Sequence, residues 1–303
     1  MAKKTTNLLG IIITILAGTY FYITCCSSCG TTVKDDPVKE AVVPVATKEA
    51  TSYPFAFSDG EYTYNENDNY NFNVSSSSIL MPLTQKVTDG IASLKAFLAE
   101  NAGKVINITG YYKSDENNDS AFPNLGLARA NAVKNHLVEN GISSTQINTI
   151  GKLMDEMISK DNVYLGPVEY GLAGEAADAK DELKALYDKI TANPLVLYFE
   201  TNQAAIDLSA EQRQKVADIS RYLDKVEDAS CNVIGHTDNV GRRGPNIRLG
   251  QGRADFGKAY LVKNGIAASK ITASSKGPDV PAESNATEAG RSKNRRTVVT
   301  LNK

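Results

Sequence analysis

The sequence predicts an α/β protein with two tandem βαβαβ domains, each with helices packed on one mixed sheet, behind an N-terminal transmembrane helix. Three observations lead to this prediction. An uncharged, apolar run lies near the N-terminus. Predicted strands alternate with amphipathic helices through the rest of the chain. One order of elements, with a Leu-Gly-x-x-Arg-Ala motif that begins a helix, occurs twice, at Leu125 and at Leu249.

The composition is that of a folded protein with nearly balanced charge. The chain has 303 residues and a formal net charge of −2, which suits about two domains and gives no general attraction to nucleic acid. Cys25, Cys26 and Cys29 lie together and Cys231 is alone, so we expect no disulfide framework. We interpret the cluster as membrane-proximal cysteines that are open to lipidation, because no histidine lies near them to complete a metal site.

The N-terminal run has the features of a membrane-spanning helix. Residues 8–26 contain no charged side chain and just reach the length of about 20 residues that a spanning helix needs. Lys3 and Lys4 precede the run and place the N-terminus in the cytoplasm, and Tyr20 and Tyr22 are typical of an interfacial aromatic belt. We expect an uncleaved anchor. A lipoprotein signal is the second interpretation and a cleaved signal peptide the third.

Five parts follow one another along the chain. Residues 30–52 contain two prolines and no aromatic residue, which indicates an extended linker. Residues 173–193 are rich in Ala, Lys, Asp and Glu and predict a linker helix that Pro194 ends. The parts are a membrane or signal segment, an extended linker, a first domain, a linker helix and a second domain, at residues 1–29, 30–52, 53–172, 173–193 and 194–303.

The elements of the second domain follow from local patterns. The apolar and aromatic run at residues 195–200 predicts a buried strand. Ser209, with Gln212 three residues later, predicts a helix that starts with a capping box. Asn246 is predicted as the N-cap of the next helix and Gly265 as its end. Three further strands are predicted at residues 231–235, 270–275 and 297–301.

No set of residues suits catalysis, metal binding or phosphate binding. Gly235 and His236 lie at a strand end without a nucleophile motif, so we interpret both as structural loop residues. The two histidines fall in different domains, and the glycine-rich loop lacks the lysine of a phosphate loop. The basic segment 291–299 has no interleaved aromatic residue for stacking on bases. We therefore predict no enzyme activity, no cofactor, no metal and no nucleic-acid partner.

Asp238 and Arg253 form the most informative charged pair. Asp238 lies in a strand-end loop, and Arg253 lies in the helix that we expect to return to that loop. Such a pair forms either a plain salt bridge or a clamp for a zwitterion. In the clamp, Asp238 takes an ammonium and Arg253 grips a carboxylate through its planar fork. A small ligand with both groups on one carbon suits this clamp.

The second domain resembles the C-terminal domain of the OmpA-like family. The shared motifs are 235-GHTDNVG-241, Asn246, 249-LGQGRA-254, 264-NGI-266, Asn285, Thr287 and 290-GRSKNRR-296. The resemblance implies non-covalent binding of peptidoglycan in a bacterial envelope, through the diaminopimelate of the stem peptide. The key residues of the family fall on Asp238 and Arg253. Its further binding residues fall on Thr237, Asn246, Arg295 and Arg296. Gly250 departs from the serine that is usual in the family.

The first domain resembles a degenerate copy of the second. It keeps Arg129 and the Leu-Gly start of the motif, but Lys113 stands where the second domain has Asp238. A lysine there would repel the ammonium of a zwitterion. We therefore predict that the first domain has lost the clamp, and that it is a spacer or binds a protein partner.

The whole sequence predicts a non-catalytic protein that tethers a membrane to the cell wall. The alternatives are an envelope scaffold and a stator-like energy-transducing subunit, although proton conduction needs an ionisable group that residues 8–26 lack. A wall hydrolase is disfavoured because no catalytic set is present. An uncleaved anchor implies the inner membrane with the body in the periplasm. A lipid on Cys25 or Cys26 allows the outer membrane.

Overall fold

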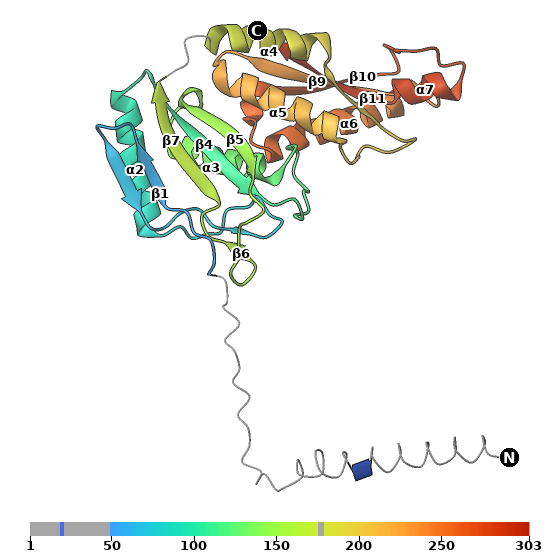
Figure 1. Cartoon of the computed structure of the whole chain (residues 1–303). Helices are drawn as coiled ribbons and strands as arrows, with labels where there is room; N and C mark the ends of the chain where they lie inside the picture. Colours follow the sequence, from blue (N-terminus) through green and yellow to red (C-terminus); the bar gives the residue numbers. More distant parts are fainter. Residues whose placement is uncertain (1–18, 21–48, 175–178, 303) are drawn as a thin grey trace, which may run out of the picture. The chain divides into compact units, whose positions relative to one another are not determined.

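The structure is a computed structural model of the chain that describes residues 19–20, 49–174 and 179–302. The described residues from 49 onward belong to one compact unit (Figure 1). The predicted membrane run at residues 8–26 and its cysteines lie outside the described residues, apart from Thr19 and Tyr20. In the part of the chain that the structure describes, no helix is both long and apolar enough to cross a membrane.

The second segment (residues 194–303) is built around a four-stranded mixed sheet in the order β10–β9–β11–β8 (Figure 1). β9 and β10 are parallel, whereas β11 is antiparallel to both β9 and β8. The strands are β8 (Leu195–Tyr198), β9 (Ser230–His236), β10 (Ile271–Gly277) and β11 (Arg296–Asn302). The helices are α5 (Ala210–Lys225), α6 (Arg243–Lys263), α7 (Glu288–Asn294) and the short 3-10 helix η3 (Ala268–Lys270).

One hydrophobic core joins the helices of this segment to its sheet. Val216, Ile219 and Leu223 recur at helical spacing on α5 and are buried, so α5 has one apolar face. They belong to the same cluster as Leu197 of β8 and Val233 of β9. The mixed α/β class predicted from the sequence is therefore confirmed for the described residues.

The two helix starts that the sequence predicted have different outcomes. The capping box of α5 is confirmed, because the Ser209 hydroxyl accepts from Gln212 N and the Gln212 side chain accepts from Ser209 N. The prediction of Asn246 as an N-cap is wrong. α6 begins at Arg243, and the Asn246 side chain instead donates to the carbonyls of Asp238 and Val240. The Asn246 side chain therefore fixes the loop before α6 and does not cap the first N–H groups of the helix.

The first segment (residues 53–172) contains a shorter version of the same sheet. Its order is β5–β4–β7, with β4 and β5 parallel and β7 antiparallel, as in β10–β9–β11. A two-residue strand, β3, pairs with β6 outside this sheet, and β1 pairs with β2. The strands are β1 (Phe55–Ser58), β2 (Thr63–Glu66), β3 (Phe72–Asn73), β4 (Lys104–Tyr112), β5 (Ile147–Leu153), β6 (Val163–Tyr164) and β7 (Val168–Gly174). The helices are α2 (Gln85–Glu100), α3 (Leu125–Glu139) and the 3-10 helix η2 (Ser144–Gln146).

Glycine pairs bring a helix close to the central strand in both segments. A Cβ built on Gly235 of β9 would lie 1.8 Å from the carbonyl oxygen of Gly250 in α6. A Cβ on Gly110 of β4 would lie 2.0 Å from the oxygen of Gly126 in α3. This close crossing places the first turns of the helix beside the loop that follows the strand. It also explains the glycine at position 250, where an added Cβ would lie 2.3 Å from Ser275 Oγ.

The predicted linker helix corresponds to α4 (Ala179–Ala192), which lies between the two segments in the sequence. Ile190 is buried in the core cluster of the second segment, and Leu183, Leu186 and Tyr187 pack against that cluster. α4 therefore contributes its apolar stripe to the second segment.

Candidate functional site

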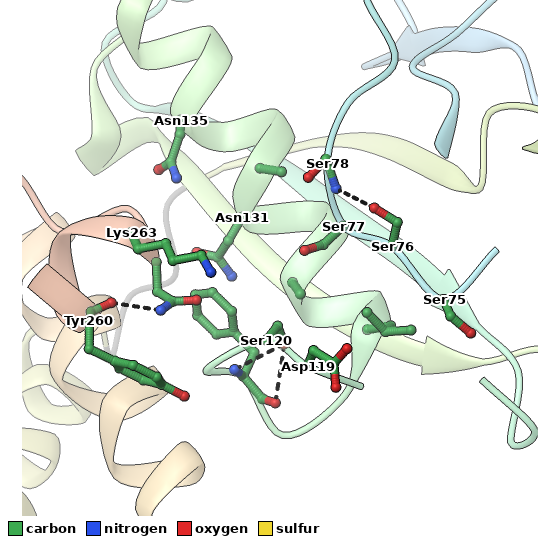
Figure 2. A pocket seen from close by; sticks show the side chains of 15 residues that line it. Ser75, Ser76, Ser77, Ser78, Asp119, Ser120, Asn131, Asn135, Tyr260 and Lys263 are labelled. Atoms are coloured by element: carbon green, nitrogen blue, oxygen red, sulfur yellow. Dashed lines mark hydrogen bonds between the residues drawn. The ribbon is translucent and has the colours of Figure 1, made fainter. Parts of the chain in front are cut away.

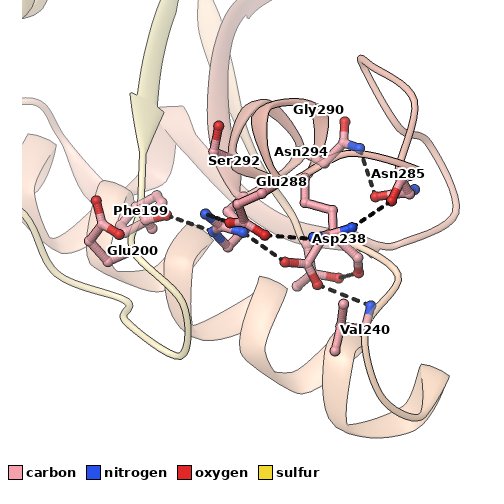
Figure 3. A network of polar contacts seen from close by, with 12 residues as sticks. Phe199, Glu200, Asp238, Val240, Asn285, Glu288, Gly290, Ser292 and Asn294 are labelled. Carbon is pink, nitrogen blue, oxygen red and sulfur yellow. Dashed lines mark hydrogen bonds and ion pairs between the residues drawn. The ribbon is translucent and has the colours of Figure 1, made fainter.

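Asp238 lies in the loop between β9 and α6, where two donors hold its carboxylate. Its Oδ2 accepts from Arg295 Nη1 at 3.1 Å, and its Oδ1 accepts from the backbone N–H of Val240 at 3.1 Å (Figure 3). The Asp238 side chain is 12% exposed, and the Arg295 side chain is 6% exposed. The carboxylate is thus fixed in place and keeps only a small accessible surface.

Arg295 connects three parts of the second segment through its guanidinium. Besides Asp238, it donates from Nη2 to Glu288 of α7 at 2.9 Å and from Nε to the carbonyl of Phe199 at 3.2 Å. The Phe199 N–H in turn donates to the carbonyl of Arg295. Figure 3 shows this network between the end of β8, the loop with Asp238 and helix α7. Arg295 therefore connects Asp238 to α7 and to the residue that follows β8.

Arg253 is fully buried and serves as a brace for three backbone carbonyls. Its Nε donates to Gln203 O at 2.9 Å, its Nη1 to His236 O at 2.9 Å and its Nη2 to Glu200 O at 3.2 Å. The guanidinium lies over the Phe199 ring, 5.2 Å from its centroid. Burial lowers the pKa of Arg253 to about 10, which leaves it charged at neutral pH.

The expected arrangement of Asp238 and Arg253 needs two corrections. The plain salt bridge between them is wrong, because Asp238 pairs with Arg295. Arg253 is also fully buried rather than open beside Asp238, because its side chain satisfies carbonyls beneath the surface. Arg253 nevertheless lies under the loop that carries Asp238, since its Nη1 donates to the carbonyl of His236, two residues before Asp238.

Two N–H groups of Arg253 have no acceptor among the described residues. A guanidinium has five N–H donors, and the three carbonyls take one each from Nε, Nη1 and Nη2. One N–H on each Nη atom is left. A pair of N–H groups, one on each Nη atom of a guanidinium, can match the two oxygens of a carboxylate.

Arg129 of the first segment makes the same three carbonyl contacts. Its Nε donates to Ser76 O, its Nη1 to Tyr111 O and its Nη2 to Asn73 O. Its guanidinium lies over the Phe72 ring at 5.8 Å, as that of Arg253 lies over Phe199. The turns that supply two of the carbonyls also match: Ser76 N donates to Asn73 O and Gln203 N to Glu200 O. Ser75 and Asn202 occupy the same place in these turns, both with positive φ.

The difference between the segments is a carboxylate. The two remaining N–H groups of Arg129, one on Nη1 and one on Nη2, both donate to the Glu116 carboxylate, at 3.0 and 2.5 Å. The side chains of Arg129 and Glu116 are 0% and 1% exposed. Glu116 thus takes the donors that have no protein acceptor in the second segment. A carboxylate in an irregular loop carries no sequence signal of its own, and Glu116 was not among the predicted site residues.

The remaining predicted residues surround the loop that carries Asp238. Thr237 is buried; its hydroxyl donates to Asp238 O and its N–H to Gly277 O. Arg296 donates from Nη2 to Val280 O at 3.3 Å, away from Asp238. Burial lowers the pKa of the His236 imidazole to about 4, and the charge of Arg296 adds to this shift. His236 is therefore neutral at pH 7, and its Nδ1 has no hydrogen-bond partner.

The described residues hold no cluster suited to a metal, but they line a polar cavity. No group of three or more His, Cys, Asp and Glu side chains in residues 49–174 and 179–302 is arranged to hold a metal ion. A cavity of about 450 Å³ is lined by Ser75–Ser78 of the loop after β3, by Asn131 of α3 and by Tyr260 and Lys263 of α6 (Figure 2). Its lining side chains are mainly hydroxyls and amides, with one anion, Asp119, and one cation, Lys263.

Comparisons with known proteins give one family. The OmpA family model matches residues 71–163 and 198–295. The outer membrane porin F of Pseudomonas fluorescens is 43% identical over 81 residues, which are 27% of this chain and 25% of the porin. The probable lipoprotein YiaD of Escherichia coli is 30% identical over 142 residues, 45% of this chain and 65% of that protein. The peptidoglycan-binding protein ArfA of Mycobacterium tuberculosis is 34% identical over 130 residues, 43% of this chain and 37% of that protein.

The chain thus spans less than two thirds of the length of each of these relatives. Among solved structures, the peptidoglycan-associated lipoprotein from Burkholderia pseudomallei aligns with a TM-score of 0.33 and 23% identity, over 35% of this chain and 89% of that one. The two stretches matched by the family model contain more than half of the 303 residues. The chain therefore belongs to the OmpA family, with one OmpA-like stretch in each segment.

Proposed function

We propose that the second segment binds peptidoglycan non-covalently and that the chain tethers a membrane to the cell wall. The observation that carries this proposal is the pair of Arg253 N–H groups without an acceptor among the described residues, under the loop that carries the Asp238 carboxylate. An anion site and a cation site side by side suit a zwitterion. The name of the relative ArfA, a peptidoglycan-binding protein, supports the same ligand class.

In this proposal, Arg253 and Asp238 bind oppositely charged groups of the same ligand. The free N–H groups on Arg253 Nη1 and Nη2 take the carboxylate of the ligand in a bidentate contact. Each Asp238 oxygen accepts one hydrogen bond from the protein and has lone-pair capacity left for an ammonium. The amino acid end of diaminopimelate in the stem peptide carries both groups on one carbon and fits this clamp. The loop that carries Asp238 is positioned by Arg295, which donates to the Asp238 carboxylate, and by Asn246, which donates to the Asp238 carbonyl.

The burial of Arg253 sets a requirement for binding. Its side chain has no exposed surface, so a carboxylate reaches its Nη atoms only when a neighbouring group moves. Two of the three braced carbonyls belong to Glu200 and Gln203, in the irregular segment between β8 and α5. A shift of this segment is the movement that brings the ligand to Arg253.

The proposed role is binding without catalysis, in the periplasm. His236 is neutral and buried, and its Nδ1 has no hydrogen-bond partner among the described residues, so we assign it no proton-transfer step. The membrane end of the tether is the predicted anchor in residues 1–29, with the inner membrane favoured and a lipidated outer-membrane form as the alternative. The first segment then separates the wall-binding segment from the membrane, or binds a protein partner.

Asp238→Asn tests the proposal without disturbing the brace around Arg253. The substitution keeps the shape and the acceptor for Val240 N, but it removes the charge that holds the ammonium and the oxygen that accepts from Arg295. Truncating one partner of a buried charged contact costs about 2–5 kcal/mol, so we expect a loss of affinity of roughly 30-fold or more. The measurement is co-sedimentation of the full chain with purified peptidoglycan.

Asp218→Asn is the matched control, because Asp218 also forms an ion pair, with Lys189, but lies on α5. We expect this variant to sediment with peptidoglycan as the wild type does. Wild-type binding by Asp238→Asn, with the protein folded, would contradict the clamp.

A further inference from the structure

Glu116 has the contacts of a bound ligand rather than those of a surface side chain. Its carboxylate accepts two hydrogen bonds from Arg129 and two from backbone N–H groups, those of Ser75 and Lys113, at 2.9 Å each. Four donors therefore converge on one carboxylate that is 1% exposed. We use the name carboxylate cradle for these donors of the first segment: Arg129 Nη1, Arg129 Nη2, Ser75 N and Lys113 N.

The second segment presents the same four donors. Arg253 corresponds to Arg129 through its three carbonyl contacts, and Asn202 corresponds to Ser75 through the matching turn. Asp238 lies two residues after His236, as Lys113 lies two residues after Tyr111, and both His236 and Tyr111 give their carbonyl to the arginine. Among the described residues, neither Asn202 N nor Asp238 N has a recorded acceptor. The second segment therefore has a residue that corresponds to each residue of the carboxylate cradle.

The residue at the position of Glu116 differs between the segments. Glu116 is the fifth residue after Tyr111, and the fifth residue after His236 is Gly241, which has no side chain. Lys113 O also accepts from Glu116 N, which folds this loop back so that the Glu116 side chain reaches Arg129. Figure 2 shows the serine loop, from Ser75 to Ser78, that lies along α3 and contributes the Ser75 donor.

We propose that Glu116 is a built-in ligand that closes the carboxylate cradle of the first segment. Glu116 determines which segment binds an external carboxylate, because it accepts from the donors of the first segment that would otherwise bind such a group. Removal of the Glu116 carboxylate then opens a site for a small monocarboxylate on Arg129. Lys113 at the position of Asp238 gives this site no anion for an ammonium, so the ligand class is a simple carboxylate and not a zwitterion.

Glu116→Ala in the full chain, with acetate as the probe, tests this proposal. The methyl side chain leaves room for acetate, whose two oxygens replace those of Glu116. We expect the midpoint of thermal unfolding to rise by roughly 3–5 °C when acetate is about tenfold above its dissociation constant, relative to chloride at equal ionic strength. The wild type sets the baseline for any acetate bound elsewhere, including at Arg253.

Two control variants separate this site from general effects of acetate. Glu116→Gln fills the same volume and leaves no room for acetate, so its response stays at the wild-type level. The double variant Glu116→Ala/Arg129→Met removes the guanidinium together with its partner and shows no added response. If Glu116→Ala does not fold in chloride, its refolding yield is measured against acetate concentration, and we expect the yield to rise with acetate.

The proposal is overturned if acetate stabilises Glu116→Ala no more than the wild type, or stabilises Glu116→Gln or the double variant equally well. It is also overturned if acetate fails to raise the refolding yield of an unfolded Glu116→Ala. The test concerns acetate at Arg129 alone, so its failure leaves the proposed binding of peptidoglycan at Arg253 untouched.

Discussion

At the residue scale, the same side chain serves the fold and the proposed binding function. Arg253 donates to three backbone carbonyls with three of its N–H groups, and the two others correspond to the N–H groups of Arg129 that donate to Glu116. Removal of Arg253 would leave these carbonyls without a donor, at a cost of about 1–3 kcal/mol for each buried group. A loss of binding in Arg253→Ala would therefore not separate recognition from folding, whereas Asp238→Asn does.

His236 makes the stability of the second segment depend on pH. Its pKa is about 4 in the folded protein against 6.5 for the free imidazole, so the unfolded chain binds more protons between these values. The free energy of unfolding therefore falls as the pH drops below about 6.5, by up to about 3 kcal/mol near pH 4. Urea unfolding of the wild type and of His236→Gln, at about pH 7 and about pH 4.5, checks this prediction.

The expected result is a smaller loss of stability on acidification in His236→Gln than in the wild type. His136→Gln is the control, since His136 lies on α3 of the first segment, where its Nδ1 contacts the Tyr70 hydroxyl. An equal loss in the wild type and in His236→Gln would show that His236 does not titrate as the structure indicates.

At the element scale, the site depends on how closely α6 crosses β9. The contact between Gly235 and Gly250 sets the height of α6 over the sheet, and thus the position of Arg253 beneath the loop with Asp238. The equivalent contact between Gly110 and Gly126 places Arg129 in the same way. The glycines therefore belong to the geometry of the arginine brace as much as to the packing of the core.

Gly235→Ala is expected to destabilise the second segment. The added Cβ would lie 1.8 Å from a backbone oxygen of α6, so the helix has to move, at a cost of about 1–3 kcal/mol or more. Gly252→Ala is the matched control on the same helix, because its Cβ would lie 3.8 Å from Ala204 Cβ, an ordinary contact. Thermal unfolding checks both variants, and equal midpoints would contradict the tight crossing.

The sequence predicted the elements of the second segment better than the partners within the site. The strands, the capping box and the glycine end of α6 follow from local patterns, and the structure has them. The acceptors of Arg253 are backbone carbonyls, which every residue has, so no residue type marks them. Arg295, the partner of Asp238, lies 57 residues away in the sequence. The resemblance to the family marked Arg295 as a binding residue but did not predict its ion pair with Asp238. Helix α7 is short and polar, with no apolar period to predict it.

At the scale of the whole molecule, the two segments share the buried arginine and its three carbonyl acceptors, but they differ in the residues beside that arginine. The OmpA family model matches a stretch in each, and each holds an arginine on the same three carbonyls. The first segment has Glu116 and Lys113 where the second has Gly241 and Asp238. The chain is thus proposed to carry one wall-binding clamp and one closed copy of it, with its membrane end in residues 1–29.

The most direct test of this account is the stoichiometry of binding to a soluble stem peptide that ends in diaminopimelate, measured by calorimetric titration of the full chain. We expect one site per chain in the wild type and no measurable site in Asp238→Asn. Two sites per chain would contradict the closure of the first segment by Glu116. An unchanged single site in Asp238→Asn would contradict the assignment of the clamp to the second segment.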